Sequence, residues 1–437
     1  MKNKKVKVIG AGLAGCEAAF YLARRGVEVE LYDIKPKKFT PAHVSENFAE
    51  LVCSNSLKSN DVYGNAAGLL KEEMRILGSL VIEAADKTKV PAGGALAVDR
   101  DKFSAYITDK IKAEKKVTFI SEEIEEISTD GYTVVATGPL TQGKLCDTLT
   151  DIAGGLHFYD ASAPIVSAES IDKEYSFIGD RYDRGSGDHI NCPMNEAQYK
   201  EFVGELLNAE RTELHSFEKT EVFEGCMPIE IMAARGEDTL RFGPLKPVGL
   251  TDPKTGRWAY ACLQLRRENE NGTMYNLVGF QTNLKWGEQK RVFSIIPALK
   301  NAEYLRYGVM HRNTFINSPS CLAPDYSLKI RPNVFVAGQI TGVEGYVESA
   351  MSGLMAGIYL ERKLKDKKEI LISDDTVSGA LARYITTENK DFQPMNANFG
   401  IIPPLDRIIK DKKEKKRLQA ERSLAATKEF IKYITED

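Results

Sequence analysis

The chain has 437 residues, and 59 lysines and arginines against 62 aspartates and glutamates give a net charge of −3. Hydrophobic residues make up 43% and charged residues 28%, which argues against disorder as the main state. The charge balance does not itself indicate a nucleic-acid-binding protein, although a local basic patch is enough for one. At roughly 150 residues per domain, the length predicts two or three domains.

Neither a membrane span nor a metal site is expected. No apolar run reaches the roughly 18 residues of a spanning helix, and the basic N-terminus runs directly into a glycine-rich motif, so we interpret it as mature protein. The seven cysteines are odd in number and widely spaced, without a CxxC pair. This pattern disfavours a disulfide framework or a zinc site and fits a reducing cytoplasm.

Residues 5–33 predict a strand, a glycine turn, a helix and a second strand, which is the length of a βαβ unit. Gly10, Gly12 and Gly15 form GxGxxG directly after the first strand. The spacing alone is weak evidence, but in this setting it indicates a dinucleotide site. Gly10 permits the tight turn, Gly12 lets the backbone approach a pyrophosphate, and Gly15 lets helix and strand pack closely.

The first unit also supplies a hydrogen-bond acceptor for the cofactor. Asp33 ends the second strand, where its carboxylate is placed to accept hydrogen bonds from ribose hydroxyls. The helix N-terminus offers free N–H groups to the phosphates. The cofactor-binding residues predicted in this unit are Gly10, Ala11, Gly12, Leu13, Ala14, Gly15 and Asp33.

Two later segments favour FAD over NAD as the dinucleotide. TVVATG (133–138) is similar to the strand-then-ATG segment of flavoproteins with two dinucleotide domains. VFVAGQITGVEGY (334–346) resembles their late FAD segment, in which small residues let the backbone approach the flavin. This segment adds Gly338 and Gln339 to the predicted contacts. A helix expected after Gly345 directs its N-terminus toward the isoalloxazine.

The middle of the chain has a different character. Residues 34–100 are irregular apart from a helix near 66–77, and short strand-like runs begin near Phe158. These runs are APIV, TEVFEGCMPIE, RWAYACLQL and MYNLVGFQT. The strand-then-helix pattern of the N-terminal unit returns near Val334, with the predicted strand NVFVAG followed by a long predicted helix. The basic run at 410–417 is interpreted as a solvated helix face, with RNA contact as the lesser alternative.

This order predicts an α/β protein in which one domain interrupts another. We expect a discontinuous Rossmann-like FAD-binding domain at 1–157 and 325–437. An inserted mixed α/β domain at 158–324 is expected to face the substrate.

Two cysteines have unusual surroundings. Cys53 stands in FAELVCSNSLKSN close to Lys58, and Cys226 stands in FEGCMPIEIMAARG shortly before Arg235. Positive charge beside a thiol favours the reactive thiolate. No GxSxG, HExxH or Walker A sequence occurs, so a redox cofactor must carry the hard chemistry with thiols assisting. The cysteines interpreted as ordinary small apolar residues are Cys16, Cys146, Cys192, Cys262 and Cys321.

Long blocks of this sequence resemble one family. They are FAELVCSNSLKSN, LLKEEMR, VPAGGALAVDR, FEGCMPIEIMA, FGPLKPVGL, YGVMHRNTFINSP and FVAGQITGVEGYVESAMSG. Together they are similar to TrmFO, the folate- and FAD-dependent tRNA (uracil-5-)-methyltransferases of bacteria, over more than four-fifths of the chain. The chain is more distantly similar to the tRNA-modifying flavoprotein MnmG.

The resemblance implies an enzyme that reduces bound FAD with NADPH or NADH. The one-carbon donor would be methylenetetrahydrofolate, and the carbon would pass to carbon 5 of a uridine in the T-loop of tRNA. Cys226 matches the family cysteine that activates uracil, and Cys53 matches the one held near the flavin as protector or general base. Tyr346 matches the tyrosine that lies against the flavin ring. Asp33 stands where most relatives are expected to have Glu.

Several alternatives stay open from the residues alone. The same chemistry would serve a uridine of ribosomal RNA, and a flavin oxidoreductase without an RNA substrate is a second alternative. The choice between NADPH and NADH, the oligomeric state and the division of roles between the two cysteines are not determined. A local basic face for RNA would be built from Lys246, Lys285, Arg235, Arg241, His311 and Arg312.

Overall fold

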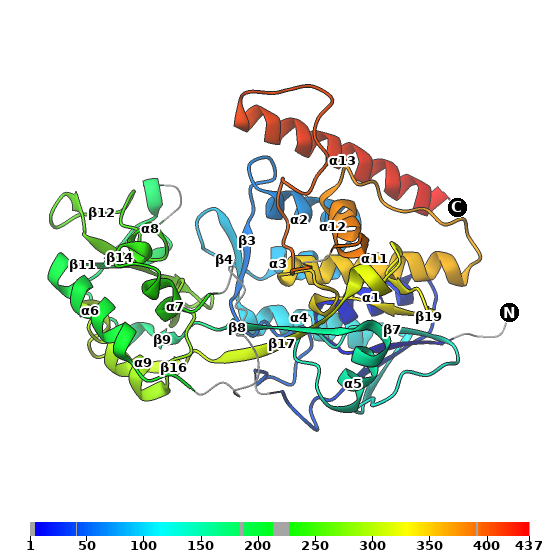
Figure 1. Cartoon of the computed structure of the whole chain (residues 1–437), viewed down its shortest axis with the longest axis horizontal. Helices are drawn as coiled ribbons and strands as arrows, with labels where there is room; N and C mark the ends of the chain where they lie inside the picture. Colours follow the sequence, from blue (N-terminus) through cyan, green and yellow to red (C-terminus); the bar gives the residue numbers. More distant parts are fainter. Residues whose placement is uncertain (1–4, 41, 184–186, 213–226, 390–391, 437) are drawn as a thin grey trace.

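The computed structural model describes residues 5–40, 42–183, 187–212, 227–389 and 392–436. They form two α/β halves, each built on a six-stranded sheet (Figure 1). Both ends of the chain belong to the first half, and the green segment between them forms the second (Figure 1). Within the described part of the chain, no helix combines the length and the apolar character that a membrane span requires.

The first sheet has the order β18-β19-β7-β1-β2-β6. All its neighbouring strands run parallel except β18, which pairs antiparallel with β19. The strands are β1 (Val6–Ile9), β2 (Val29–Asp33), β6 (Val117–Ser121), β7 (Tyr132–Val135), β18 (Ser327–Leu328) and β19 (Arg331–Val336). This order places β1 at the centre, as in Rossmann-like folds, and it confirms the predicted fold class.

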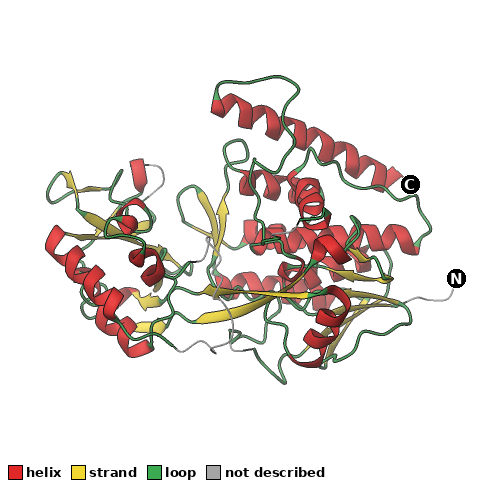
Figure 2. Ribbon diagram, in the orientation of Figure 1, coloured by secondary structure: helices red, strands yellow, loops and turns green. Residues whose placement is uncertain are grey.

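Helices cover both faces of this sheet (Figure 2). On one face α1 (Leu13–Arg24) and α11 (Tyr346–Leu364) pack against each other. A Cβ on Gly353 of α11 would lie 2.1 Å from the carbonyl oxygen of Ala14, so the small residues of ESAMSG serve close helix packing. On the other face α5 (Gly143–Ala153) covers alternate residues of β7 and β19.

The second half is centred on an antiparallel sheet with the order β10-β11-β14-β15-β9-β16. Its strands are β9 (Ile165–Ser167), β10 (Phe177–Ile178), β11 (His189–Met194), β14 (Ala261–Arg267), β15 (Met274–Leu277) and β16 (Tyr304–Arg306). The helices that share its core are α6 (Glu196–Asn208), α7 (Ile229–Ala234), α8 (Thr239–Phe242) and α9 (Trp286–Phe293). A two-stranded ribbon, β8 (Gly155–Ala161) with β17 (Met310–Ile316), runs between the halves (Figure 1).

Among the described residues, a small sheet and six helices complete the first half. The sheet has the order β3-β5-β4, with β3 (Ser56–Ser59), β4 (Lys89–Val90) and β5 (Ala95–Val98). The helices are α2 (Ala66–Ile76), α3 (Leu80–Lys87), α4 (Arg100–Ala113), α10 (Ser318–Cys321), α12 (Val377–Thr386) and α13 (Lys412–Glu436). The basic run at 410–417 leads into α13, which lies over α2 (Figure 1).

One predicted strand is wrong within its described part. The run TEVFEGCMPIE was expected to be extended, but Pro228 caps α7 and Ile229 begins that helix. A proline lacks the N–H that a central strand needs, and it is well suited to a helix start. At Pro228 this preference outweighs the strand preference of the β-branched residues in the run. RWAYACLQL is divided between β13 (Arg257–Trp258) and β14. The bounds of the two predicted domains stay a prediction.

Candidate dinucleotide cleft and adjoining pocket

The glycine-rich turn between β1 and α1 forms the floor of a cleft. Gly10 has a φ of +102°, and a Cβ on it would lie 2.4 Å from the carbonyl oxygen of Ala136, so only glycine fits. A Cβ on Gly15 would lie 1.8 Å from the carbonyl oxygen of Gly10. A Cβ on Gly12, in contrast, would meet no protein atom within 4 Å. The open space at Gly12 is what the approach of a pyrophosphate needs.

Residues that follow five strands of the first sheet line this cleft. The carboxyl ends of parallel strands are where α/β folds bind their ligands. The predicted cofactor residues that line the cleft are Gly10, Ala11, Gly12, Leu13, Ala14, Asp33, Gly338, Gln339 and Tyr346. Gly15 lies behind the turn and is buried. The structure therefore brings the first βαβ unit and the late segment to one cavity.

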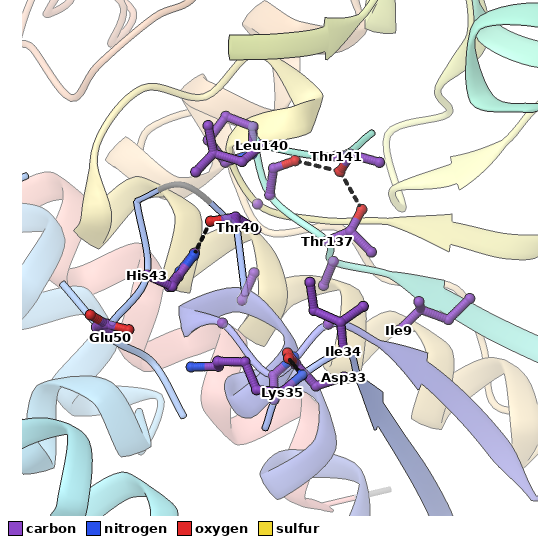
Figure 3. Close-up of a pocket in the computed structure, with 18 of the residues that line it drawn as sticks. Ile9, Asp33, Ile34, Lys35, Thr40, His43, Glu50, Thr137, Leu140 and Thr141 are labelled. Atoms are coloured by element: carbon purple, nitrogen blue, oxygen red, sulfur yellow. Dashed lines mark hydrogen bonds between the residues drawn. The ribbon is translucent and has the colours of Figure 1, made fainter. Parts of the chain in front are cut away.

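Asp33 supports the turn and also faces the cleft (Figure 3). Its Oδ2 accepts a hydrogen bond from the backbone N–H of Ala11 at 2.7 Å, and its Oδ1 accepts one from the backbone N–H of Lys35 at 2.9 Å. A carboxylate oxygen can accept more than one hydrogen bond, so these contacts leave capacity for a ligand hydroxyl.

Two polar pairs lie at the rim of the cleft, and of their members only Thr137 belongs to a predicted segment, TVVATG (Figure 3). Thr40 Oγ1 and His43 Nδ1 are hydrogen-bonded at 2.6 Å, and burial lowers the pKa of His43. The hydroxyl of Thr141 bonds to that of Thr137 at 2.7 Å. The lowered pKa favours the neutral imidazole, so positive charge in this part of the cleft comes from Lys35 and Lys38 rather than from His43.

Tyr346 begins α11 and connects the cleft to Cys53. Its hydroxyl oxygen accepts hydrogen bonds from the backbone N–H groups of Cys53 at 2.6 Å and Ser54 at 3.2 Å. Burial raises the pKa of Tyr346, so its phenol stays protonated at neutral pH. The tyrosine therefore fixes the start of the Cys53 loop against the helix N-terminus.

Two arginines from opposite halves hold the Cys53 loop. Arg100 of α4 donates to the carbonyl oxygens of Leu51 and Cys53, the second at 3.3 Å. Arg266 of β14 donates to Ser54 Oγ at 2.7 Å and to Asn55 Oδ1 at 3.0 Å. The position of Cys53 therefore depends on side chains nearly 50 and more than 200 residues away in sequence.

Three arginines lie near enough to Cys53 to interact with it electrostatically, namely Arg100, Arg266 and Arg306. Cations beside a thiol favour its nucleophilic form. The sequence indicated Lys58 as the nearby cation, and the three arginines were missed because they come from distant segments.

A second pocket adjoins the cleft. Cys53 and Lys58 line it from the first half, and Gln281 and Asn313 come from the second half and the connecting ribbon. The residues that line both cavities are Val52, Pro139, Leu140, Gln339 and Tyr346. A ligand that fills the cleft as far as Tyr346 would therefore contact a ligand in the second pocket.

The predicted catalytic residue Cys226 lies outside the described residues. The chain on either side of the undescribed segment 213–226 is anchored to one stretch of backbone. Thr212 donates its N–H to the carbonyl oxygen of Asn283 at 2.9 Å, and Ile229 donates to that of Gln281 at 2.7 Å. Gln281 also lines the second pocket. The chain next to Cys226 thus lies close to the pocket that contains Cys53.

The residues predicted to form a basic face are spread over the second half. Arg235, Arg241 and Lys246 lie in or beside α7 and α8, whereas Lys285 precedes α9. Arg241 and Lys285 each form an ion pair with an acidic neighbour. The side chains at 311–312 lie outside the described part. An RNA-binding face built from these residues stays a prediction.

The fold and the cleft define an α/β protein with a Rossmann-like dinucleotide site. Two crystal structures of Aquifex aeolicus GidA share this fold, with TM-scores of 0.71 and 0.72. They cover 98% and 99% of this chain, which covers 73% and 76% of theirs. At 15% and 16% sequence identity, this likeness shows the fold alone.

Sequence relatives narrow the class to one family. The profile described as "Glucose inhibited division protein A" matches residues 5–368. The proteins named methylenetetrahydrofolate–tRNA-(uracil-5-)-methyltransferase TrmFO from Acetivibrio thermocellus and Listeria monocytogenes are 57% and 56% identical to this chain. Each match covers 98% of both sequences, and the Staphylococcus aureus protein of that name is 56% identical over 99% of this chain. The chain therefore belongs to the TrmFO family, as its sequence blocks indicated.

Proposed function

We propose that this protein methylates carbon 5 of a uridine in the T-loop of tRNA with methylenetetrahydrofolate as the carbon donor. The observation that carries the proposal is the cleft that adjoins a cysteine-containing pocket in a chain at least 54% identical to proteins named for this activity. Those names support tRNA over the ribosomal RNA and RNA-free alternatives. An enzyme of this kind acts where tRNA is found, so we place it in the cytoplasm.

FAD is the dinucleotide that these residues fit. The turn at 10–13 and the N-terminus of α1 would hold the pyrophosphate, and Asp33 would accept from a ribose hydroxyl. Gln339 and Tyr346 would contact the isoalloxazine, since they line both cavities. Bound FAD would supply redox chemistry driven by NADPH or NADH and transfer of a one-carbon unit.

Two cysteines would prepare the uridine. A thiolate of Cys226 would add to carbon 6 of uracil, which places negative charge on the carbonyl oxygen and makes carbon 5 nucleophilic. After the carbon is transferred at the methylene level, loss of the carbon 5 proton and of the thiolate, together with a two-electron reduction whose electrons bound reduced FAD would supply, leaves a methyl group on the restored ring. Cys53 would act as base or protector beside the flavin, and the hydrogen bonds of its backbone with Arg100 and Tyr346 support this role. The target base must leave its stack to reach this pocket.

One experiment tests this proposal. The purified protein is incubated without oxygen with labelled methylenetetrahydrofolate, NADPH and a mixed pool of tRNA and ribosomal RNA, and the nucleosides of each RNA are analysed. Label in 5-methyluridine from tRNA is expected, and fragment analysis then assigns it to the T-loop. Label only in ribosomal RNA, or no label in a protein that retains its flavin, would contradict the proposal. Replacing NADPH with NADH determines the preferred reductant.

A further inference from the structure

An ion pair is built into the wall of the second pocket, beside Cys53. Lys58 Nζ lies 3.1 Å from Glu348 Oε1, and both residues line the pocket. The side chain of Glu348 has no exposed surface, whereas that of Lys58 is 43% exposed. The two residues are 290 positions apart, so neither sequence motifs nor local patterns join them.

The backbone at Lys58 adopts a conformation that is unusual for lysine. Its φ is +63°, where the register of β3 against β5 is interrupted. The buried Lys71 of α2 donates hydrogen bonds of 2.7 Å to the carbonyl oxygens of Leu57 and Ser59, on either side of Lys58. Non-glycine residues held at positive φ gather at functional sites, and here the buried amine of Lys71 holds the strained segment in place.

Gly345 leaves room for this pair. It has a φ of +120° and precedes α11. A Cβ there would lie 2.2 Å from Glu348 Oε2 and 2.8 Å from Lys58 Nζ. The glycine therefore lets the carboxylate and the ammonium lie directly against the backbone at the helix start.

The hydrogen bonding of Glu348 is incomplete. Its Oε1 accepts from Lys58 and from the backbone N–H of Ala397 at 3.0 Å. Its Oε2 is buried and accepts no hydrogen bond from the described residues. A buried carboxylate oxygen without a donor is costly, and a ligand N–H in the adjoining pocket would satisfy it.

We propose that Lys58 and Glu348 bind the lactam edge of a heterocycle in the second pocket. A lactam presents a ring N–H beside a carbonyl oxygen, so Glu348 would accept the N–H and Lys58 would donate to the oxygen. Uracil and the pterin of folate both have this edge. The inference rests on the proposed function, since that function supplies both rings. If the ring is uracil, Lys58 also stabilises the negative charge that develops on the carbonyl oxygen after addition at carbon 6.

Two variants test the pair, and a third is their control. Glu348→Gln replaces an acceptor oxygen with an N–H₂ group, and Lys58→Met removes the donor while retaining length. The control is Glu361→Gln on the same helix, where a buried carboxylate (2% exposed) pairs with Lys365 (41% exposed) outside both cavities. Flavin content and melting temperature are measured for all three proteins.

Two measurements distinguish the rings. Tetrahydrofolate is titrated anaerobically into the flavin-loaded enzyme and followed by flavin absorbance, and methyl transfer to saturating tRNA is followed in a single turnover. If the pair binds the pterin, Glu348→Gln and Lys58→Met weaken tetrahydrofolate binding about tenfold or more. If it binds uracil, folate affinity stays at the wild-type value and the transfer rate falls about tenfold or more. Lys58→Arg should restore part of either loss.

The proposal is overturned if both variants keep flavin and change neither measurement by more than about twofold. It is also overturned if Glu361→Gln reproduces the losses, because the effect would then come from removing any buried ion pair of α11. If Glu348→Gln fails to hold flavin, the more exposed Lys58→Met supplies the test. If wild-type protein transfers no methyl group to tRNA, the proposed function fails, while the tetrahydrofolate titration still tests the pair.

Discussion

The cleft and the second pocket lie side by side, but they are built in different ways. Backbone and glycine turns at the ends of neighbouring strands form much of the cleft. The second pocket is lined by apolar side chains together with a few polar and charged ones, and they come from both halves and from the ribbon between them. The cleft is therefore suited to a chain-like ligand with phosphates, and the pocket to a flat ring with a polar edge. Substitutions should separate the two sites.

A few residues form the wall that the two cavities share. Tyr346 lines both, and its hydroxyl holds the backbone of the Cys53 loop. Arg266 holds the same loop from the second half. Loading of the cleft and chemistry in the pocket should therefore respond to different variants, with the Cys53 loop as the element that connects them.

The largest effect is expected at the turn. Gly10→Val should yield colourless protein with a lower melting temperature, because a β-carbon there would overlap the backbone at Ala136. Gly12→Ala is the matched control, since its β-carbon meets no protein atom. It should fold normally and only weaken flavin binding, measured by absorbance after dialysis. Equal flavin content in Gly10→Val and wild type would contradict this account of the turn.

The next effect should leave the cleft intact. Cys226→Ala is expected to keep its flavin and lose methyl transfer by roughly a thousandfold or more, since the nucleophile is gone. Single-turnover transfer to tRNA measures the loss. The control is Cys192→Ala, a buried cysteine of β11 outside both cavities. Normal transfer by Cys226→Ala would show that the nucleophile has been misassigned.

A smaller effect should follow from loosening the Cys53 loop. Arg266→Met removes the hydrogen bonds to Ser54 and Asn55 without touching the cleft. Transfer is expected to fall about 10- to 100-fold while flavin content is retained, because misplaced reacting groups lose rate steeply. Arg291→Met, at an exposed ion pair in the same half, is the control. A loss of flavin equal to the loss of rate would contradict the separation of the two sites.

The smallest predicted effect is on the pH dependence of the free energy of unfolding. Glu17 of α1 is buried and accepts hydrogen bonds from Ser79 and from the backbone of Leu80 and Val81. Burial raises the pKa of Glu17 to about 7 from 4.5, although these bonds oppose the shift. The folded chain thus binds the proton more tightly than the unfolded chain. This contribution to stability is complete below pH 4.5 and is lost as the pH rises through 7.

Urea denaturation at pH 5.5 and pH 8 measures this contribution. Between these values the free energy of unfolding of wild type should fall by on the order of 2 kcal/mol more than that of Glu17→Gln, whose side chain does not titrate. Transfer rates of the two proteins should stay within about threefold, because Glu17 lines neither cavity. An identical pH dependence of stability in both proteins would show that the folded carboxyl titrates as it does in the unfolded chain.

Local patterns predicted the cleft well for a physical reason. Tight turns, helix starts and alternating strands are decided by a few neighbouring residues, so GxGxxG, Asp33 and the helix after Gly345 were readable in order. The end of the run TEVFEGCMPIE was misread because β-branched residues are common in strands, whereas Pro228 favours the helix start that the structure has. Cys226 was identified by its family block, and its geometry lies outside the described residues.

The sequence by itself determined the class of the fold, the glycine-rich turn at the floor of the cleft and, through its long blocks, the family. Only the tertiary structure decided how Cys53 is held, that Lys58 faces Glu348, and that the two cavities share Tyr346. Contacts of this kind join residues up to about 290 positions apart, and their energy depends on burial and on the direction of side chains. Burial and side-chain direction are set only when the two sheets and the ribbon between them have formed.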